Sequence, residues 1–268
     1  MTEIPFVKLH GAQNDFLLTW SDQAPTDALP EVARRICART TGIGADGWML
    51  VSKGDGHLQT RLFNSDGSEP EISGNGTRCA GAFGLITGTI SGPVVKVLTA
   101  AGEKTLRLID RSGNFFQFEM DMGFPRAEEL RTSLHLGGQD FDATILNVGN
   151  PQCAIFVDEF PPEWRKFAAE AENHERFPAR SNVSFVQILD RHTVNALFYE
   201  RGAGETKSSG TGSTGAAVAA ILRGEVESPV EIRTPAGSLH LRWAESVYLT
   251  GPAEVVGEGK FFLDLRNS

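Results

Sequence analysis

Two stretches of the chain, FNSDGSEPEISGNGTRCAGAFGLITG (63–88) and YERGAGETKSSGTGSTGAAVAAILRG (199–224), align without a gap at an offset of 136 residues. The identical pairs of this repeat include Ser73 and Ser209, Gly74 and Gly210, Gly76 and Gly212, Ala80 and Ala216, and Gly88 and Gly224. A period near half the chain length indicates two similar halves rather than a solenoid. We therefore predict two pseudosymmetric halves, residues 1–117 with 256–268 and residues 118–255.

The rest of the chain carries many short strand signals and few helix signals. Segments rich in Val, Ile, Phe and Thr, or alternating in polarity, predict strands at 95–100, 104–110, 114–122, 153–160, 182–189, 193–200, 230–237, 238–244 and 246–251. Helices are predicted at 26–40, with Thr26 as N-cap and Pro30 in its first turn, and at 74–88, 161–174 and 210–224. This mixture predicts an α+β fold in which the two small-residue helices pack closely against a sheet or are wholly buried.

Each copy of the repeat predicts an anion-binding turn with a serine beside it. A glycine-rich turn at a helix start exposes backbone N–H groups, and the helix dipole adds partial positive charge. Two such turns facing one another would share one carboxylate, with Ser73 and Ser209 on opposite sides of the adjacent carbon. That arrangement suits removal of a proton from one face and its return to the other. The simpler alternative is a pair of serine N-caps followed by flexible glycines.

Composition excludes several classes of function. The 268 residues carry a net charge of −9, which argues against a nucleic-acid partner and against a basic membrane-binding surface. No apolar run reaches the roughly 20 residues that span a bilayer, and the first residues show no secretory signal. The three cysteines, Cys37, Cys79 and Cys153, lack CxxC spacing, so we expect free thiols, a cytoplasmic location and no metal site.

The chain resembles the diaminopimelate epimerase family. The motifs that carry the resemblance occur in the family's order: FVKLHGAQNDF (6–16), TGIGADG (41–47), FNSDGSEPE (63–71), GNGTRC (74–79), NVGNPQC (147–153), NVSFV (182–186), ERGAGET (200–206) and SGTGSTGAA (209–217). The resemblance implies two pseudosymmetric halves, each a curled, mainly antiparallel sheet around a central helix. It also implies a cofactor-independent isomerase that converts LL- to meso-diaminopimelate, a precursor of lysine and the cell wall, and a homodimer.

The resemblance also implies roles for individual residues. Ser73, Ser209 and Glu200 occupy catalytic positions, and Asn64, Asn182 and Arg201 would hold the distal, non-reacting end of the amino dicarboxylate substrate. The remaining substrate-binding residues would be Asn14, Asn75 and Asn150 around the pocket, with the backbone amides of Gly74, Asn75, Gly210 and Thr211 on the reacting carboxylate.

Three positions of the acid/base machinery depart from the family. The family has a catalytic cysteine where Ser73 and Ser209 stand, and usually a histidine where Gln152 stands. A serine hydroxyl is far less acidic than a thiol and needs an adjacent base. Glu200 is the base that the family suggests; Ser73 has none, although Glu69 and Glu71 lie nearby in the sequence.

Three interpretations follow from these departures. In the first, the chain is a working epimerase whose serines act with carboxylate or water assistance. In the second, it is a related dehydratase or lyase that needs proton removal from one face only. The third is an amino-acid-binding protein without turnover, or an engineered double substitution of an ordinary epimerase. Gln152 speaks against simple engineering, because a cysteine-to-serine change would leave the histidine in place.

Overall fold

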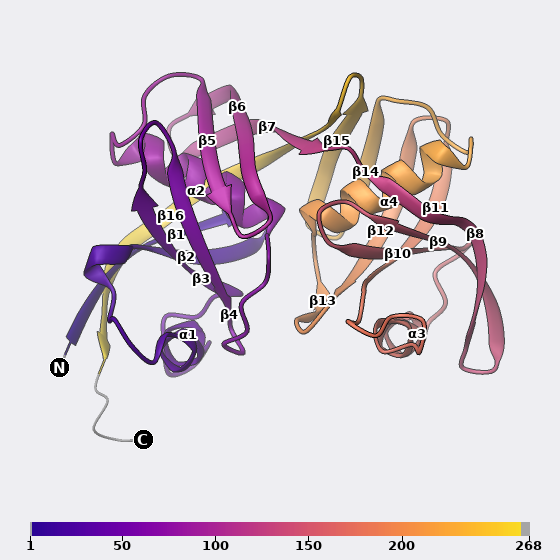
Figure 1. Ribbon diagram of the computed structural model, residues 1–268, viewed down its shortest axis with the longest axis horizontal. Coiled ribbons are helices and arrows are strands. Elements are labelled where there is room, and N and C mark those ends of the chain that lie inside the picture. The colour runs from indigo at the N-terminus through magenta and orange to yellow at the C-terminus, as the bar shows by residue number, and fades with distance from the viewer. Residues whose placement is uncertain (1, 264–268) are drawn as a thin grey trace. The chain divides into compact units, whose positions relative to one another are not determined.

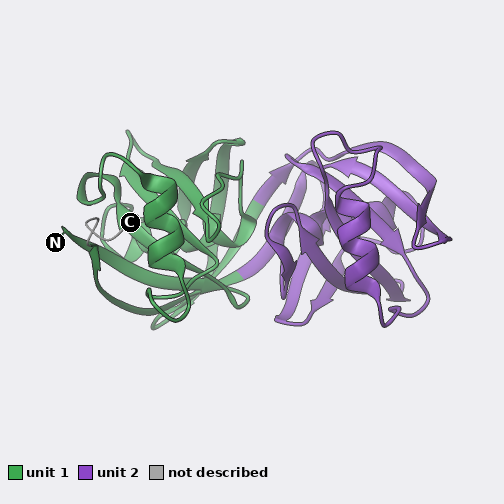
Figure 2. Cartoon of the chain, turned by 90° about the horizontal axis from the view of Figure 1, so that it is seen from below, with its two compact units in different colours: residues 1–120, 252–268 green, residues 121–251 purple. Residues whose placement is uncertain are grey.

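The computed structural model describes residues 2–263, and the chain divides into two compact units. Unit 1 comprises residues 1–120 and 252–268, and unit 2 comprises residues 121–251 (Figure 2). The chain passes from one unit to the other within β7 (Phe115–Gly123) and within β16 (Val247–Leu263). Residues 264–268, which the sequence assigned to the first half, lie outside the described residues.

Unit 1 is a sheet that closes around one helix. Its elements, in chain order, are β1 (Thr2–Gly11), β2 (Asn14–Trp20), η1 (Ser21–Gln23), α1 (Leu29–Cys37), β3 (Gly47–Lys53), β4 (Leu58–Asn64), α2 (Gly74–Ile86), β5 (Val94–Thr99), β6 (Gly102–Ser112) and β7. The strands follow one another in the order β1 to β7, and β16 neighbours both β7 and β1. Helix α2 contacts β1, β2, β4, β5 and β6, so it occupies the interior of this sheet (Figure 1).

Unit 2 repeats the plan. Its elements are β8 (Arg126–Leu136), β9 (Gln139–Asn147), β10 (Pro151–Phe156), α3 (Trp164–Glu172), β11 (Asn182–Asp190), β12 (Thr193–Glu200), β13 (Gly204–Thr206), α4 (Gly210–Leu222), β14 (Val230–Thr234), β15 (Gly237–Trp243) and the start of β16. The sheet order is β15-β14-β12-β11-β10-β9-β8, and β13 pairs with β12. Helix α4 contacts β8, β9, β10, β11, β12, β14 and β15, so it has the same place in the sheet of unit 2 that α2 has in the sheet of unit 1.

The structural repeat is longer than the sequence repeat. Helices α2 and α4 begin and end at positions that differ by the same 136 residues. The ends of β4 and β12, Asn64 and Glu200, keep this offset, as do the ends of β1 and β9. The α+β fold with two pseudosymmetric halves and central helices is therefore confirmed.

Small side chains explain why α2 and α4 are buried. A Cβ atom on Gly81 would lie 2.6 Å from Leu106 Cδ1, and one on Gly212 would lie 2.7 Å from Phe198 Cδ1. Glycine thus lets each central helix approach its sheet closely. Helices α1 and α3 instead bury one face each, in clusters around Trp48 and Phe185. Helix α1 starts after Ala28, so the predicted Thr26 N-cap is wrong.

Candidate active site

Both serines of the repeat are N-caps of the central helices. Ser73 Oγ accepts a hydrogen bond from the Gly76 amide at 3.1 Å, and Ser209 Oγ accepts one from the Gly212 amide at 3.0 Å. The two cap residues share the extended backbone conformation typical of N-caps. An N–H donor and a helix N-terminus both stabilise negative charge on an oxygen, so the capping geometry also favours an alkoxide at either position.

Ser209 has a carboxylate partner. Its Oγ donates to Glu200 Oε1 at 2.7 Å, and the serine is 2% exposed. Because an ionised carboxylate only accepts, the hydroxyl hydrogen points at Glu200 while an Oγ lone pair accepts from Gly212. Glu200 ends β12 and Ser209 precedes α4, so the sheet and the central helix hold the pair together. This is a hydroxyl activated by an adjacent base.

Ser73 has no equivalent partner. The position that corresponds to Glu200 is Asn64, whose Nδ2 donates to Ser68 Oγ at 3.0 Å. Glu69 binds Arg61 through both carboxylate oxygens, at 2.7 and 2.9 Å. Within residues 2–263 no carboxylate hydrogen-bonds to Ser73, which lines a cavity of about 310 Å³ in unit 1. The two turns therefore have the same backbone conformation, but only Ser209 has a carboxylate base beside it.

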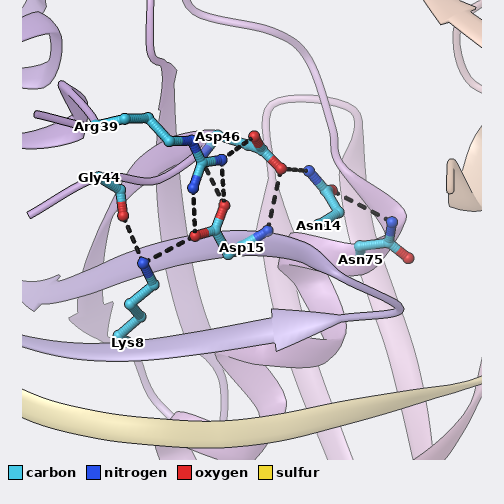
Figure 3. Close-up of polar contacts among 7 residues, drawn as sticks. All are labelled: Lys8, Asn14, Asp15, Arg39, Gly44, Asp46 and Asn75. Carbon is cyan, nitrogen blue, oxygen red and sulfur yellow. Dashed lines mark hydrogen bonds and ion pairs between the residues drawn. The ribbon is translucent and has the colours of Figure 1, made fainter. Parts of the chain in front are cut away.

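Asparagine side chains brace the first turn of each central helix. In unit 1, Asn75 Nδ2 donates to Asn14 Oδ1 at 3.2 Å, and Asn14 Nδ2 donates to Asp46 Oδ2 at 2.7 Å (Figure 3). These three residues belong to a network that also contains Asp15 and Arg39.

The same positions are paired in unit 2. Asn150 and Thr211 correspond to Asn14 and Asn75, and Asn150 Nδ2 lies 3.4 Å from Thr211 Oγ1. Gln152 Nε2 donates to Asn150 Oδ1 at 2.8 Å, while Gln152 Oε1 is buried without a partner. Four predicted pocket residues thus lie in pairs at the two helix starts, and Gln152 supports one of those pairs.

Asn182 and Arg201 lie together in unit 2. Asn182 Oδ1 accepts from the Arg201 backbone amide at 3.0 Å, and its Nδ2 donates to the Pro151 carbonyl at 2.9 Å. Asn182 therefore fixes the backbone beside Glu200. Arg201 Nη1 donates to the Ala179 carbonyl at 3.3 Å. Their substrate-binding roles stay predictions.

Sequence reasoning missed two residues of unit 1, Asp46 and Arg78. Asp46 ends the motif residues TGIGAD and holds Asn14, but nothing in its local sequence identifies that partner. Arg78 is fully buried in α2, and its Nη2 donates to Asn75 Oδ1. A single arginine inside a small-residue helix is the signal that could have identified it.

Among the described residues, 2–263, no group of three or more His, Cys, Asp and Glu side chains is arranged to hold a metal ion. No helix in that part of the chain is long and apolar enough to cross a membrane.

The fold is shared with an amino-acid epimerase. A solved hydroxyproline epimerase from Agrobacterium vitis superposes with a TM-score of 0.77 at 17% identity, over 99% of this chain and 94% of that one. The shared fold alone does not identify the family of this chain, and the sequence comparisons do.

The chain belongs to the diaminopimelate epimerase family, whose sequence pattern matches residues 6–127 and 144–256. It is 39% identical to the diaminopimelate epimerase of Moorella thermoacetica, over 97% of this chain and 99% of that protein. It is 35% identical to that of Desulfitobacterium hafniense, over 96% and 98% of the two chains. The resemblance is confirmed, and the relatives are isomerases.

Proposed function

We propose that the protein is a cofactor-independent diaminopimelate epimerase that inverts the α-carbon with serine hydroxyls in place of thiols. The observation that carries the proposal is the 2.7 Å hydrogen bond from Ser209 to Glu200. Epimerisation needs a base on one face of the α-carbon and an acid on the other. The family membership supports the substrate, and the paired serine turns support the two-sided chemistry.

In the first step Ser209 Oγ takes the α-proton while its own proton passes to Glu200. The Cα–H bond breaks, and its electron pair moves into the substrate carboxylate, which becomes an enediolate. Backbone amides of Gly74, Asn75, Gly210 and Thr211 are the proposed donors to that carboxylate. Donors already in place where charge develops are the most effective form of stabilisation.

In the second step Ser73 gives its hydroxyl proton to the opposite face, and solvent water reprotonates its oxygen. Glu200 then releases to solvent the proton that it took from Ser209, which restores the starting state. The Gly76 amide, 3.1 Å from Ser73 Oγ, stabilises the transient alkoxide. Water must reach Ser73 for this step, and its side chain is half-buried rather than enclosed. In the reverse direction Ser73 would have to act as base without a carboxylate, so the two directions are chemically unequal.

The second candidate function is a dehydratase or lyase reaction that removes a proton from one face only. It is favoured by one observation, the presence of Asn64 where the other unit has Glu200. An amide cannot accept the proton of Ser73, so one turn lacks the base that reversible inversion would use. In that reaction the electron pair expels a leaving group from the neighbouring carbon instead of collecting a second proton.

The test is incubation with LL-, meso- and DD-diaminopimelate in D₂O, followed by proton NMR and chiral analysis. An epimerase will incorporate deuterium at the α-carbon and interconvert the stereoisomers. A one-sided enzyme will exchange the α-proton without inversion, because diaminopimelate has no leaving group on the carbon next to its α-carbon. Absence of deuterium uptake from all three isomers would contradict the epimerase function and favour a binding protein or a one-sided enzyme for another substrate.

We propose that Arg201, Asn64 and Asn182 bind the distal end of the substrate and that Arg201 pairs with its carboxylate. Arg201→Ala should weaken diaminopimelate binding by about 1.5–3 kcal/mol, because a charge-assisted hydrogen bond is lost. Isothermal titration calorimetry gives the affinity. Arg165→Ala is the matched control, because Arg165 is an exposed arginine of the same unit that pairs with Glu205. Equal affinity in the wild type and Arg201→Ala would show that the ligand is another molecule.

The proposal includes a homodimer in the cytoplasm, as the family resemblance implies. The three cysteines are free and buried, which fits a reducing compartment.

A further inference from the structure

Arg78 is a buried cation directly behind the Ser73 turn. Its Nε donates to the Pro252 carbonyl at 3.0 Å and its Nη2 donates to Asn75 Oδ1. Nη1 is buried and has no hydrogen-bond partner within residues 2–263. A guanidinium buried with an unused donor is costly unless an anion compensates it.

The neighbouring charges compensate one another and leave Arg78 unpaired. Lys8 Nζ lies 2.9 Å from Asp15, and Arg39 bridges Asp15 at 2.9 Å and Asp46 at 2.7 Å (Figure 3). Two cations thus face two carboxylates. No carboxylate in the described part of the chain contacts Arg78. Burial lowers the pKa of the Arg78 guanidinium to about 10, so it remains positive at neutral pH.

The hydrogen-bond partners fix the direction of both asparagine amides. Arg78 can only donate, so Asn75 presents its Oδ1 to it, and Asp46 accepts from Asn14 Nδ2. The remaining bond must run from Asn75 Nδ2 to Asn14 Oδ1, as observed at 3.2 Å. The aligned amides connect the guanidinium to a carboxylate and hold Asn75 at both ends of its side chain.

Close packing keeps this arrangement dry. A Cβ atom on Gly11 would lie 3.1 Å from Asn75 Cβ and 3.1 Å from the Pro252 carbonyl oxygen, the acceptor of Arg78. Asn75 is 1% exposed. A charge in such a poorly solvated position acts over a longer distance than a surface charge.

The equivalent turn of unit 2 has different polar side chains. The position that corresponds to Arg78 is Thr214, whose Oγ1 donates to the Gly210 carbonyl at 2.9 Å. Glu200 contacts Ser209 there. One turn therefore has a buried cation behind it, and the other has a carboxylate on its serine.

We propose that Arg78 is a positioning residue that makes the Ser73 turn the half of the site that stabilises negative charge. It orients Asn75 and supplies an uncompensated positive charge to the turn, so this turn stabilises more of the negative charge that the substrate's reacting carboxylate gains than the Ser209 turn does. The identity of that carboxylate rests on the proposed function, whereas the positive potential at the turn does not.

A thiol placed at position 73 measures this potential without any substrate. Burial raises the pKa of the thiols of Cys37, Cys79 and Cys153 to about 12, so a thiol introduced by Ser73→Cys titrates alone. We expect its pKa, from the pH dependence of alkylation by iodoacetamide, to lie below the ordinary value of about 8.5. Adding Arg78→Met should raise it by about one unit, and Arg78→Lys should restore most of the shift.

The control is Arg34→Met, which removes an exposed cation that pairs with Glu31 in the same unit. It should leave the thiol pKa unchanged, because exposed charges are screened by water and salt. An unchanged thiol pKa in a folded Arg78→Met protein would show that Arg78 only fills space and satisfies Asn75.

A measurement on the single Ser73→Cys variant covers the case in which Arg78 variants fail to fold. The effect of a buried charge persists when salt rises from about 0.05 to 0.5 M, whereas surface contributions are screened. The comparison is Ser209→Cys combined with Glu200→Gln, where the thiol has the same helix start and capping amide but Thr214 in place of the arginine. A pKa of the Ser73→Cys thiol that stays lower than that of the comparison thiol at the higher salt supports the inference, and equal values overturn it.

The outcomes also separate this inference from the proposed function. A thiol pKa that responds to Arg78→Met, in a protein that exchanges no diaminopimelate proton, would support the role of Arg78 and contradict diaminopimelate as the substrate. Exchange of the diaminopimelate α-proton together with a thiol pKa that does not respond to Arg78→Met would support the substrate and contradict the role of Arg78.

Discussion

Glu200→Gln is expected to slow exchange of the substrate α-proton by about 10²–10⁴-fold, the usual contribution of a general base. Ser209 donates to Glu200 at 2.7 Å, and a glutamine amide has nearly the same shape but cannot take the proton. The measurement is the rate of deuterium uptake from D₂O by NMR at saturating diaminopimelate. Substrate affinity should change little, because the side chain acts on Ser209 rather than on the substrate carboxylate.

Glu205→Gln is the matched control for this prediction. Glu205 lies on β13, beside β12, and pairs with the exposed Arg165. Its rate should stay within about twofold of the wild type, because exposed ion pairs contribute little. A loss of less than about threefold in Glu200→Gln would show that another group, or water alone, activates Ser209.

The central helices were predictable because their signals are local. A serine N-cap, glycines in the first turn and small residues thereafter predicted 74–88 and 210–224, and the helices run from Gly74 to Ile86 and from Gly210 to Leu222. The repeat then predicted the two halves, since similar sequences at a fixed offset adopt similar folds.

Several strands gave no such signal. β3 is almost wholly buried and lacks alternation, and the first half of β8, RAEELR, is charged and exposed on both faces. Their pairing with neighbours far along the chain determines them, and local propensity does not report this. β16 was predicted only at 246–251, although it continues to Leu263 where it pairs with β1.

Individual site residues could be predicted only where the family resemblance assigned a role to that position. The Ser209–Glu200 hydrogen bond joins residues nine positions apart and agrees with the proposed base. The pairs Asn14–Asn75 and Asn150–Thr211 each join residues 61 positions apart, so only the fold brings them together. Arg78 was missed because its role depends on a carbonyl at Pro252, far along the chain.

Ser73→Cys combined with Ser209→Cys is expected to raise the epimerisation rate by about ten- to a hundredfold. A thiol with an ordinary pKa near 8.5 is a better proton carrier at neutral pH than a hydroxyl, and a helix N-terminus stabilises the thiolate. Each position already has an amide donor in place, from Gly76 and from Gly212. Chiral analysis of product from LL-diaminopimelate gives the rate.

Single replacements should help less than the pair, because inversion needs a base on one face and an acid on the other. Ser73→Cys should help more than Ser209→Cys, since Ser209 already has Glu200 as its base and Ser73 has only Gly76. Adding Gln152→His should exceed the double change. Gln152 cannot titrate, and its Oε1 is buried without a partner, whereas an imidazole at that position can exchange protons near neutral pH.

The three possible outcomes separate the interpretations of the serines. A rise supports an epimerase limited by weak acids. No activity in the wild type or in any variant favours a binding role or another substrate. A fall from a substantial starting rate would show that the serines have their own activated chemistry. In that case the Ser209–Glu200 pair would outperform a thiolate, because a carboxylate beside a thiol raises its pKa and opposes the very charge that the helix N-terminus stabilises.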